Sequence, residues 1–578
     1  MKNKTRLILL ITSIALLAPL FSLAQETPIP ADNKMQIHPQ KEAGMQFDQN
    51  EHMDDPYLPN AYDNKKVSPA YKYSNIKAEK SINTLITTVQ VNVNSNGQNI
   101  VGDAANEPNI TWNPLNKSKL AIGWRQFDNV SSNFRQAGWG YSSDSGQTWT
   151  FPGKIDPGVF HSDPVLDYDS LGNFYYNSLY TTYATTVYKS TNGGVSWSAG
   201  TPAGGGDKQW MAIDRTPGVG SGNIYSFWSQ SFTTCGPGFF TRSTNGNSSY
   251  EPCTYVSGNP SLGTMTIGNA GQLYIVGQNA TNDGVVVCKS LNAQIPNSTI
   301  VWQNPVSVPL DGYINFYPNV NPAGLLGQGN IDIDRSNGPG RGNVYVLAAV
   351  QRISNNDPGD IMFARSTDSG VIWTTPIRIN DDVSTTNSQW IGTMSVAPTG
   401  RIDVVWLDTR DGQPGSDSSA LYYSYSYDQG NTWSVNERLS PLFYPHIGYP
   451  NQNKMGDYFD MISDSTGAHL AWANTLNGEE DVYYSHIIPP TITTSVNQIS
   501  NSATFSIYPN PSSGVFIITS QAKQSQITIY NTLGEKVYSI SSTKTTNKID
   551  ISNQPSGVYF LKVIDKDGNT AVKKIIKE

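Results

Sequence analysis

The sequence is poor in cysteine, histidine and long runs of like charge, and each shortage excludes a class of protein. Three cysteines in 578 residues are too few for a disulfide framework, although Cys235 and Cys253 are the pair we favour in an oxidising compartment, with Cys288 left over. Six histidines without metal-ligand spacing disfavour a zinc enzyme, and we expect no cofactor. A net charge of −8 and no long basic run offer no source of counterion release, so nucleic acid is not an expected partner.

The first 24 residues have the pattern of a secretory signal peptide. Lys2, Lys4 and Arg6 precede an apolar run over residues 7–20, and Ala24 ends a small-residue cleavage site. The run is shorter than the roughly 20 residues of a spanning helix, and no later stretch is apolar enough to cross a bilayer. We therefore expect a mature chain without a transmembrane segment, secreted or held at the outer cell surface.

Abundant aromatic residues and glycines indicate an all-β protein with many short strands and tight turns. The chain has 31 Tyr, 13 Trp and 50 Gly. Residues 25–81 are polar and without periodicity, which predicts an irregular lead-in or linker. The first clear strand runs from Thr84 to Val93, and repeated units then continue to His486, so we assign residues 82–488 to one repeat domain.

A turn of the form S-x-[DN]-x-G-x-[ST]-W recurs through this domain. Good copies lie at Ser142–Trp149, Ser190–Trp197, Ser366–Trp373 and Ser426–Trp433; a degenerate copy lies at Ser243–Tyr250 and a fragment at Ser290–Asn292. Asp or Asn can cap the turn, Gly supplies positive φ, and Trp packs beneath the hairpin. The pattern therefore indicates a structural device.

These turns resemble the Asp box, or BNR repeat, of sialidases and related β-propellers. A second pattern, an inner strand followed by a glycine turn and another strand, recurs at intervals of about fifty residues, the size of a four-stranded blade. With the opening unit at Asn109–Trp124 this second pattern gives seven units, and the strands that precede a turn or stand in its place also number seven. Seven units predict a seven-bladed propeller; six blades is the alternative because sialidases have six. The Thr84–Val93 strand can complete the last blade, which would cover an exposed sheet edge.

A separate module follows a linker at residues 489–503, which is rich in Pro, Thr, Ser and Asn. Residues 504–578 contain Tyr508-Pro509-Asn510-Pro511 followed by Gly514, and later Gly557-Val558-Tyr559-Phe560. They resemble the type A C-terminal sorting domain of type IX secretion cargo. The resemblance implies a small β-sandwich that engages the type IX machinery and directs the protein to the cell surface or beyond it.

Propellers bind ligands where their inner strands begin and where second strands connect to third strands, because both places lie at one end of the axis. The candidate catalytic residues at these places are Asp163, Glu107 and Tyr458. The candidate substrate-binding residues are Arg125, Arg352, Arg410, Asp408, Lys208, Trp210, Trp390 and Asp457. Such a set is suited to a carboxylated sugar, because arginine grips a carboxylate and Asp or Glu transfers protons.

The sialidase resemblance implies an arginine clamp, a Tyr nucleophile paired with Glu, and an Asp acid/base. Arg125 and Arg410 are nominated for the clamp, Asp163 for the acid/base, and Tyr458 or Glu107 for the nucleophile. The Arg-Ile-Pro segment of sialidases is absent, which puts the clamp in doubt. The pairs Asp214-Arg215 and Asp334-Arg335 occur twice, so we interpret them as ion pairs between blades.

Two main functional hypotheses follow from these patterns, and a third is a peptidase accessory or adhesin whose activity lies in the N-terminal lead-in. The first is an extracellular sialidase-like glycoside hydrolase acting on glycans. The second is a propeller without catalytic activity that binds a glycan, a glycoprotein or another protein at the cell surface. Asp boxes stabilise turns in enzymes and binding proteins alike, so what separates the hypotheses is whether carboxylates and arginines converge in one accessible pocket.

Overall fold

The computed structural model describes residues 57–58, 67–75, 84–180, 183–490, 505–520, 525–566 and 570–578. They divide into two compact units, one ending at Pro489 and one beginning at Pro490. Both are built from antiparallel strands, and the described residues contain no α-helix and hence no helix able to span a membrane. The all-β prediction is confirmed, whereas the predicted signal peptide, most of the lead-in and most of the linker lie outside the described residues.

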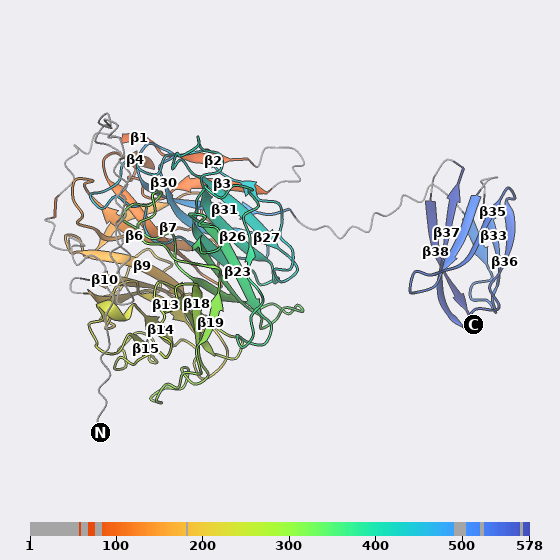
Figure 1. Ribbon diagram of the computed structural model, residues 1–578, viewed down its shortest axis with the longest axis horizontal. Helices are drawn as coiled ribbons and strands as arrows, with labels where there is room; N and C mark the ends of the chain where they lie inside the picture. Colours follow the sequence, from red (N-terminus) through yellow and green to blue (C-terminus); the bar gives the residue numbers. More distant parts are fainter. Residues whose placement is uncertain are drawn as a thin grey trace, which may run out of the picture. The chain divides into compact units, whose positions relative to one another are not determined.

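The described residues of the first unit contain seven successive sheets of three or more strands, which we number 1 to 7 along the chain. Figure 1 labels strands of each of them. Sheets 1 to 3 comprise β5 Ala104–Trp112, β6 Leu120–Phe127, β7 Gln136–Ser142 and β8 Thr150–Ile155; β9 His161–Tyr168, β10 Phe174–Tyr180, β11 Ala184–Ser190 and β12 Thr201–Pro202; and β13 Trp210–Ile213, β14 Ile224–Phe227 and β15 Phe240–Ser243.

The remaining sheets of this unit follow the same order of neighbouring strands. Sheets 4 to 6 comprise β16 Met265–Ile267, β17 Leu273–Gln278, β18 Gly284–Ser290 and β19 Val306–Pro309; β20 Gly312–Tyr313, β21 Asn330–Ile333, β22 Val344–Arg352, β23 Asp360–Ser366 and β24 Ile377–Arg378; and β25 Gln389–Val396, β26 Ile402–Asp408, β27 Ala420–Ser426 and β28 Glu437–Arg438. Sheet 7 comprises β29 Asp460–Ser463, β30 Ala468–Asn474, β31 Asp481–Ile488, β3 Leu85–Gln90 and β2 Lys72–Ser74.

Burial falls from the first strand of a sheet to the last. In sheets 1 and 6 the first two strands are buried along their whole length, whereas the short strands β24 and β28 are largely exposed. Large aromatic side chains on the second strands, among them Trp124, Trp406 and Trp472, are fully buried. The core therefore lies between neighbouring sheets, because each sheet buries its faces against the next.

Hydrogen bonds join the first strands of consecutive sheets. At six junctions a side chain on one first strand accepts a hydrogen bond from a backbone N–H of the next; the acceptors are Asn109, Asp167, Thr264, Asp332, Ser395 and Asp460, at 2.7–3.1 Å. The last of these bonds runs from Ile110 of sheet 1 to Asp460 of sheet 7. Contacts between first strands likewise proceed in order and return from β29 to β5.

Sheet 7 combines both ends of the first unit. Strand β3 pairs with β31, with Thr87 opposite His486, as expected for the Thr84–Val93 segment. Thr84 is further anchored by its backbone N–H and hydroxyl to Glu437 at 2.8 Å. Two short strands lie in the stretch that we expected to be irregular: β2 extends sheet 7, and β1 Val67–Pro69 pairs with β4 Gln98–Ile100. Their propensity is low, but the open edge at β3 offers β2 a partner, and β4 offers one to β1.

The second unit has two sheets around one core. One contains β32 Phe505–Tyr508, β33 Val515–Ser520 and β36 Thr546–Asp550; the other contains β34 Ser525–Tyr530, β35 Lys536–Ser542, β37 Gly557–Asp565 and β38 Thr570–Lys577. Phe516 and Ile518 of the first sheet share a buried cluster with Ile527 and Leu561 of the second. The alternation of buried and exposed residues along β36 and β37 explains why these segments form two-faced strands.

Candidate functional site

The same backbone position carries a residue with positive φ at the start of five sheets. These residues are Glu107, Asp163, Lys208, Leu262 and Ile391, with φ between 47° and 58°. Each lies at or just before the first strand of its sheet, and β5 and β25 contain a register shift there. Non-glycine residues rarely adopt this conformation, so its recurrence indicates that the fold imposes it and uses it to aim five different side chains.

The three charged members of this set, Glu107, Asp163 and Lys208, meet three further charged side chains in a buried group. We call this group the strand-start cluster; its other members are Arg125, Lys454 and Asp457. Lys208 Nζ lies 2.6 Å from Asp457 Oδ2 and 3.2 Å from Asp163 Oδ2. Lys454 Nζ lies 2.8 Å from Asp457 Oδ2 and 3.4 Å from Glu107 Oε1, and Arg125 Nε lies 3.3 Å from Glu107 Oε2. The side chains in these pairs are at most 3% exposed.

The cluster separates the pKa values of its carboxyl groups. Burial is the largest influence on Glu107 and raises its pKa to about 7, against the opposing effect of Arg125. Burial also raises the pKa of Asp163, but Lys208 and Arg125 outweigh it and hold that pKa well below its usual value. Lys208 and Lys454 do the same for the pKa of Asp457. Glu107, with a pKa of about 7, therefore lies in the same cluster as Asp163 and Asp457, which stay ionised at that pH.

Tyr458 and Trp210 lie next to the cluster. The Tyr458 hydroxyl donates a hydrogen bond to the backbone oxygen of Pro164 at 2.8 Å, and the two aromatic rings meet edge to face at 5.3 Å. Burial raises the pKa of Tyr458 well above its usual value. The hydroxyl is thus protonated and engaged with the backbone, an arrangement that holds the ring in place.

The three nominated arginines pair with different carboxylates. Arg125 belongs to the strand-start cluster, whereas Arg352 of sheet 5 pairs with Asp311 and Asp360 at 2.5 and 2.7 Å. In sheet 6, Arg410 pairs with Asp408 at 2.8 Å and Asp381 at 2.6 Å. Nearby, the Trp390 indole donates to the Ser419 hydroxyl. Arg352 and Arg410 therefore bind carboxylates of their own surroundings, and the arginine clamp stays a prediction.

A loop covers the strand-start cluster. The backbone N–H of Leu325 donates to Asp457 Oδ1 at 2.9 Å, and Asn321 bonds both the N–H of Met455 and the oxygen of Gly456. The loop is also tied to sheet 6, because the N–H of Ile391 donates to the backbone oxygen of Leu326 at 2.6 Å. We call residues 314–326 the cover loop, and its contacts explain why the cluster is closed to solvent.

Sequence reasoning missed Lys454 and the polar residues that support the cluster. Lys454 lies three residues before the nominated Asp457, a spacing that was the available signal. Ser162, adjacent to Asp163, donates to Asp163 Oδ1 at 2.6 Å and accepts a hydrogen bond from Arg135. Asn106, adjacent to Glu107, accepts from Arg125 Nε at 2.7 Å. These neighbours orient the charged groups that sequence reasoning did identify.

The repeated turns lie at the opposite ends of the strands. In sheet 1, Ser142 Oγ donates to Asp144 and accepts from the N–H of Gly146, while Asp144 accepts from the N–H and hydroxyl of Thr148. The Trp149 indole donates to the oxygen of Gly146. The serine-to-glycine bond recurs at Ser190, Ser366 and Ser426, so the turns are built for structure.

The recurring Asp-Arg pairs have a different partner from the one expected. Arg215 reaches back to Asp167 of sheet 2 at 2.5 Å and lies over the Tyr168 ring, so it does join neighbouring sheets. Asp214, however, accepts the backbone N–H of Thr216 within its own turn. The expected ion pair between neighbouring sheets is therefore made by Arg215 with Asp167, while Asp214, which follows the end of β13, takes its hydrogen bonds from its own turn.

Cysteine pairing agrees with the favoured assignment. Cys235 and Cys253 form a disulfide, and Cys288 is a buried free thiol whose pKa burial raises to about 12. Among the described residues, no three His, Cys, Asp or Glu side chains are grouped so as to hold a metal ion.

The model of one protein family matches the end of the chain, over residues 506–578: the secretion system C-terminal sorting domain. The C-terminal unit is a type IX secretion sorting domain. This sorting domain places the protein among those secreted or attached at the outer cell surface, and it supports an interaction with the secretion machinery. No curated protein matches the chain.

Solved structures resemble the chain at low identity. A protein of unknown function from Dyadobacter fermentans is 14% identical, with a TM-score of 0.41, covering 69% of this chain and 97% of its own. A Hadza microbial sialidase is 13% identical, with a TM-score of 0.34 and coverage of 66% and 65%. PorZ, a type IX secretion component of Porphyromonas gingivalis, is 13% identical, with a TM-score of 0.28 and coverage of 86% and 74%. Similarity at this level assigns no activity.

Proposed function

We propose that residues 82–488 form a seven-bladed β-propeller which binds a glycan or protein outside the cell without turning it over. The succession of first-strand contacts that returns from β29 to β5, together with the hydrogen bond between Ile110 and Asp460, supports a closed ring of seven sheets. The repeated serine turns are then its Asp boxes. In this proposal a signal peptide at residues 1–24 and the C-terminal sorting domain direct the protein out of the cell.

The state of the strand-start cluster carries the choice of binding over catalysis. Each carboxylate of the cluster lies within 3.4 Å of a cation, and the cover loop bonds directly to Asp457. Glycoside hydrolysis needs two carboxyl groups that flank a sugar and admit water. A closed, ion-paired cluster instead rigidifies the centre of the ring, so that the surrounding loops form the surface that meets a ligand.

One observation favours a second candidate, a sialidase-like glycoside hydrolase. Glu107, with a pKa of about 7, adjoins Asp163, whose pKa is held well below its usual value. Environments that separate the pKa values of two carboxyl groups in this way are typical of a general acid and its ionised partner. In this candidate Glu107 protonates the leaving group, and the cover loop must first move away.

A single experiment on the secreted full chain separates the two candidates. The protein is incubated with fluorogenic sialosides and other glycosides between about pH 5 and pH 8 and is applied in parallel to a glycan array. Binding without turnover, retained in Glu107→Gln and Arg410→Ala variants, supports the proposal. Turnover that falls above about pH 7 and vanishes in Glu107→Gln contradicts it and establishes the hydrolase. Asp163→Asn is the companion variant for the second carboxyl group.

A further inference from the structure

A pocket lies where two successive turns depart from the repeated form. Within the described residues sheet 3 has three strands, and its outer strand β15 is paired with no fourth strand; its edge makes a bridge between Phe240 and Thr254 and a backbone hydrogen bond from Glu251 to Arg242. In the next sheet, Trp302 lies ten residues after Asn292, whereas Trp149 lies five residues after Asp144. The missing strand and the longer turn leave a cavity of about 320 Å³ between them.

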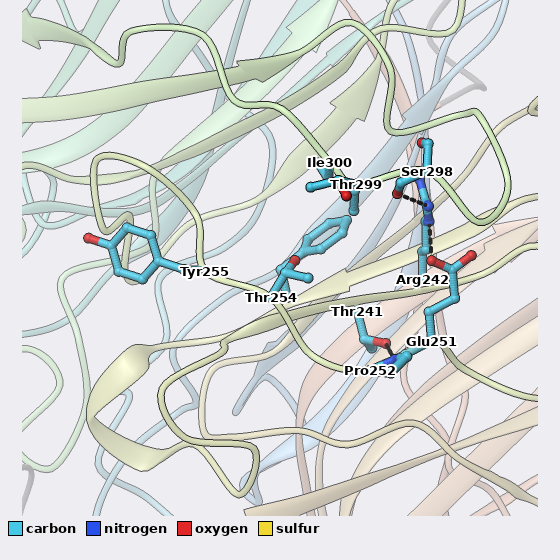
Figure 2. A pocket seen from close by; sticks show the side chains of 10 residues that line it. Thr241, Arg242, Glu251, Pro252, Thr254, Tyr255, Ser298, Thr299 and Ile300 are labelled. Atoms are coloured by element: carbon cyan, nitrogen blue, oxygen red, sulfur yellow. Dashed lines mark hydrogen bonds and ion pairs between the residues drawn. The ribbon is translucent and has the colours of Figure 1, made fainter.

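Polar and apolar groups share the lining of this pocket. Figure 2 shows Arg242 with Glu251 and Ser298 on one side, Thr254 at the centre, and Ile300 above it. The volume lies at the lower end of the range of small-molecule sites, which suits a single sugar ring.

Charge in the pocket is balanced. Arg242 is fully buried and its Nε lies 2.8 Å from Glu251 Oε2, while its other nitrogens donate to the backbone oxygens of Ala293 and Ser298. The guanidinium therefore already donates to three acceptors. No pair of its N–H groups is left for bidentate binding of a ligand carboxylate. Because Arg242 also neutralises Glu251, the pocket attracts neither an anionic nor a cationic ligand strongly.

Two hydrogen-bonding groups remain for a ligand. Glu251 Oε1 makes only long contacts of 3.4 Å, to the hydroxyl of Thr244 and the N–H of Asn297, and the side chain is 26% exposed. The Thr254 hydroxyl is buried and has no hydrogen-bond partner among the described residues. A buried hydroxyl without a partner is uncommon, and a ligand hydroxyl that reaches it would supply the missing bond.

We infer that this pocket is a binding site for a neutral sugar. The ligand's hydroxyl groups would bond to Glu251 Oε1 and Thr254 Oγ1, while the C–H face of the ring would lie against Phe240 and Ile300. None of the lining residues belongs to the strand-start cluster, so the inference goes beyond the proposed function and does not depend on it. Uncharged saccharides are its ligand class, in contrast to the carboxylated sugar suggested by the nominated arginines.

The test uses the secreted full chain and a panel of glucose, galactose, mannose and N-acetylglucosamine, with N-acetylneuraminic acid as the acidic comparison. Binding is measured by saturation-transfer NMR and calorimetry, up to about 10 mM sugar, a range suited to millimolar affinity. We expect one or more neutral sugars to bind and the acidic sugar to bind more weakly. No neutral sugar bound at that concentration, or preference for the acidic one, would overturn the inference.

Matched threonine variants locate the site. Thr254→Val keeps the shape of the side chain and removes its hydroxyl, and we expect it to weaken neutral-sugar binding about tenfold. Thr111→Val is the control, because the Thr111 hydroxyl in β5 is likewise buried without a partner among the described residues but does not line the pocket. Equal binding by the two variants overturns the inference even if array binding persists, because the glycan would then bind elsewhere.

Discussion

The two ends of the seven sheets are built on different principles. At the turn end, the same serine, aspartate or asparagine, and glycine recur from sheet to sheet with the same hydrogen bonds. At the strand-start end, the same strained backbone position carries Glu107, Asp163 and Lys208 in sheets 1 to 3 but Leu262 and Ile391 in sheets 4 and 6. We infer that the turn residues, which repeat from sheet to sheet, stabilise the fold. The strand-start residues differ between sheets, and we infer that they serve a role particular to each sheet.

The ends also differ in how they respond to protons. Burial raises the pKa of Glu107, so the folded state favours its protonated form. At the turn end, hydrogen bonds from neighbouring hydroxyl and N–H groups outweigh burial and lower the pKa of Asp144 and Asp428, so the folded state favours the ionised form. Glu107 and the turn aspartates therefore give stability contributions of opposite sign as pH changes.

The largest effect should come from removing the central cation. Lys208→Met leaves Asp163 and Asp457 without a cation that lies within 3.2 Å of both, and we expect a loss of about 3–5 kcal/mol in the free energy of unfolding. Leu262→Met, at the equivalent position of sheet 4, is the control and should cost less than about 1.5 kcal/mol. Urea denaturation measures both, and equal losses would show that the charged and apolar positions do not differ.

The pH dependence of stability tests the protonation of Glu107. Its pKa rises from an ordinary value near 4.5 to about 7 on folding, so its contribution is complete below 4.5 and is lost as the pH rises through 7. Over this window the loss should amount to about 2–3 kcal/mol, since each unit of pKa difference is worth about 1.4 kcal/mol. Glu107→Gln should reduce the slope by this amount in urea titrations at about pH 5 and pH 8, and Asp460 and Asp481, whose pKa values burial also raises to about 7, contribute to the slope that remains. An unchanged slope would assign it to another group.

A single turn should matter less. Asp428→Ala removes the acceptor for the N–H and hydroxyl of Thr432, and we expect a loss of about 1 kcal/mol at neutral pH. Asp428→Asn keeps an acceptor oxygen, as Asn192 does in sheet 2, and should cost less than half as much. Because the pKa of Asp428 is lowered on folding, the wild-type advantage over the Asn variant should fade as the pH drops below about 3.8. A larger cost for Asn than for Ala would contradict this account.

The smallest effect should come from restoring the pattern in sheet 5. Ile372 stands where Thr148 and Thr432 donate a hydroxyl to the turn aspartate, and its side chain is 71% exposed. Ile372→Thr should add a bond to Asp368 and raise the free energy of unfolding by about 0.5 kcal/mol. Thr432→Ile is the reciprocal change and should lower it by a similar amount. Thermal unfolding of the two variants measures both changes. Melting temperatures that shift in the same direction would show that the two turns are not equivalent.

Several features could be predicted because they depend on neighbours in the chain. The serine turns follow from hydrogen bonds that span four residues or fewer, and the strand content follows from alternating burial and abundant β-branched and aromatic residues. The sorting domain was recognisable because Tyr508 to Gly514 and Gly557 to Phe560 match a known pattern, and a family model covers this region. Glu107 and Lys208 were nominated because strand starts were expected to meet, and the structure brings them into one cluster.

Other features could not be predicted because their partners are distant in the sequence. Arg410 was nominated with Arg125 for a ligand clamp, and no local pattern indicated that Arg352 and Arg410 would each pair with carboxylates of their own sheet or the preceding segment. The cover loop is joined to residues more than 130 positions away, a contact that no local pattern indicates. The pocket arises from a strand that is missing in sheet 3 and a turn that is longer in sheet 4, within the described residues.

The amino-acid sequence alone established an all-β chain, its repeated turns, its favoured cysteine pair and its sorting domain, because each rests on short-range chemistry or a recognisable pattern. Folding decided whether the nominated charges would face solvent or one another. That outcome depends on which charged side chains pair with one another once distant loops close over them, since burial strengthens every attraction in the cluster.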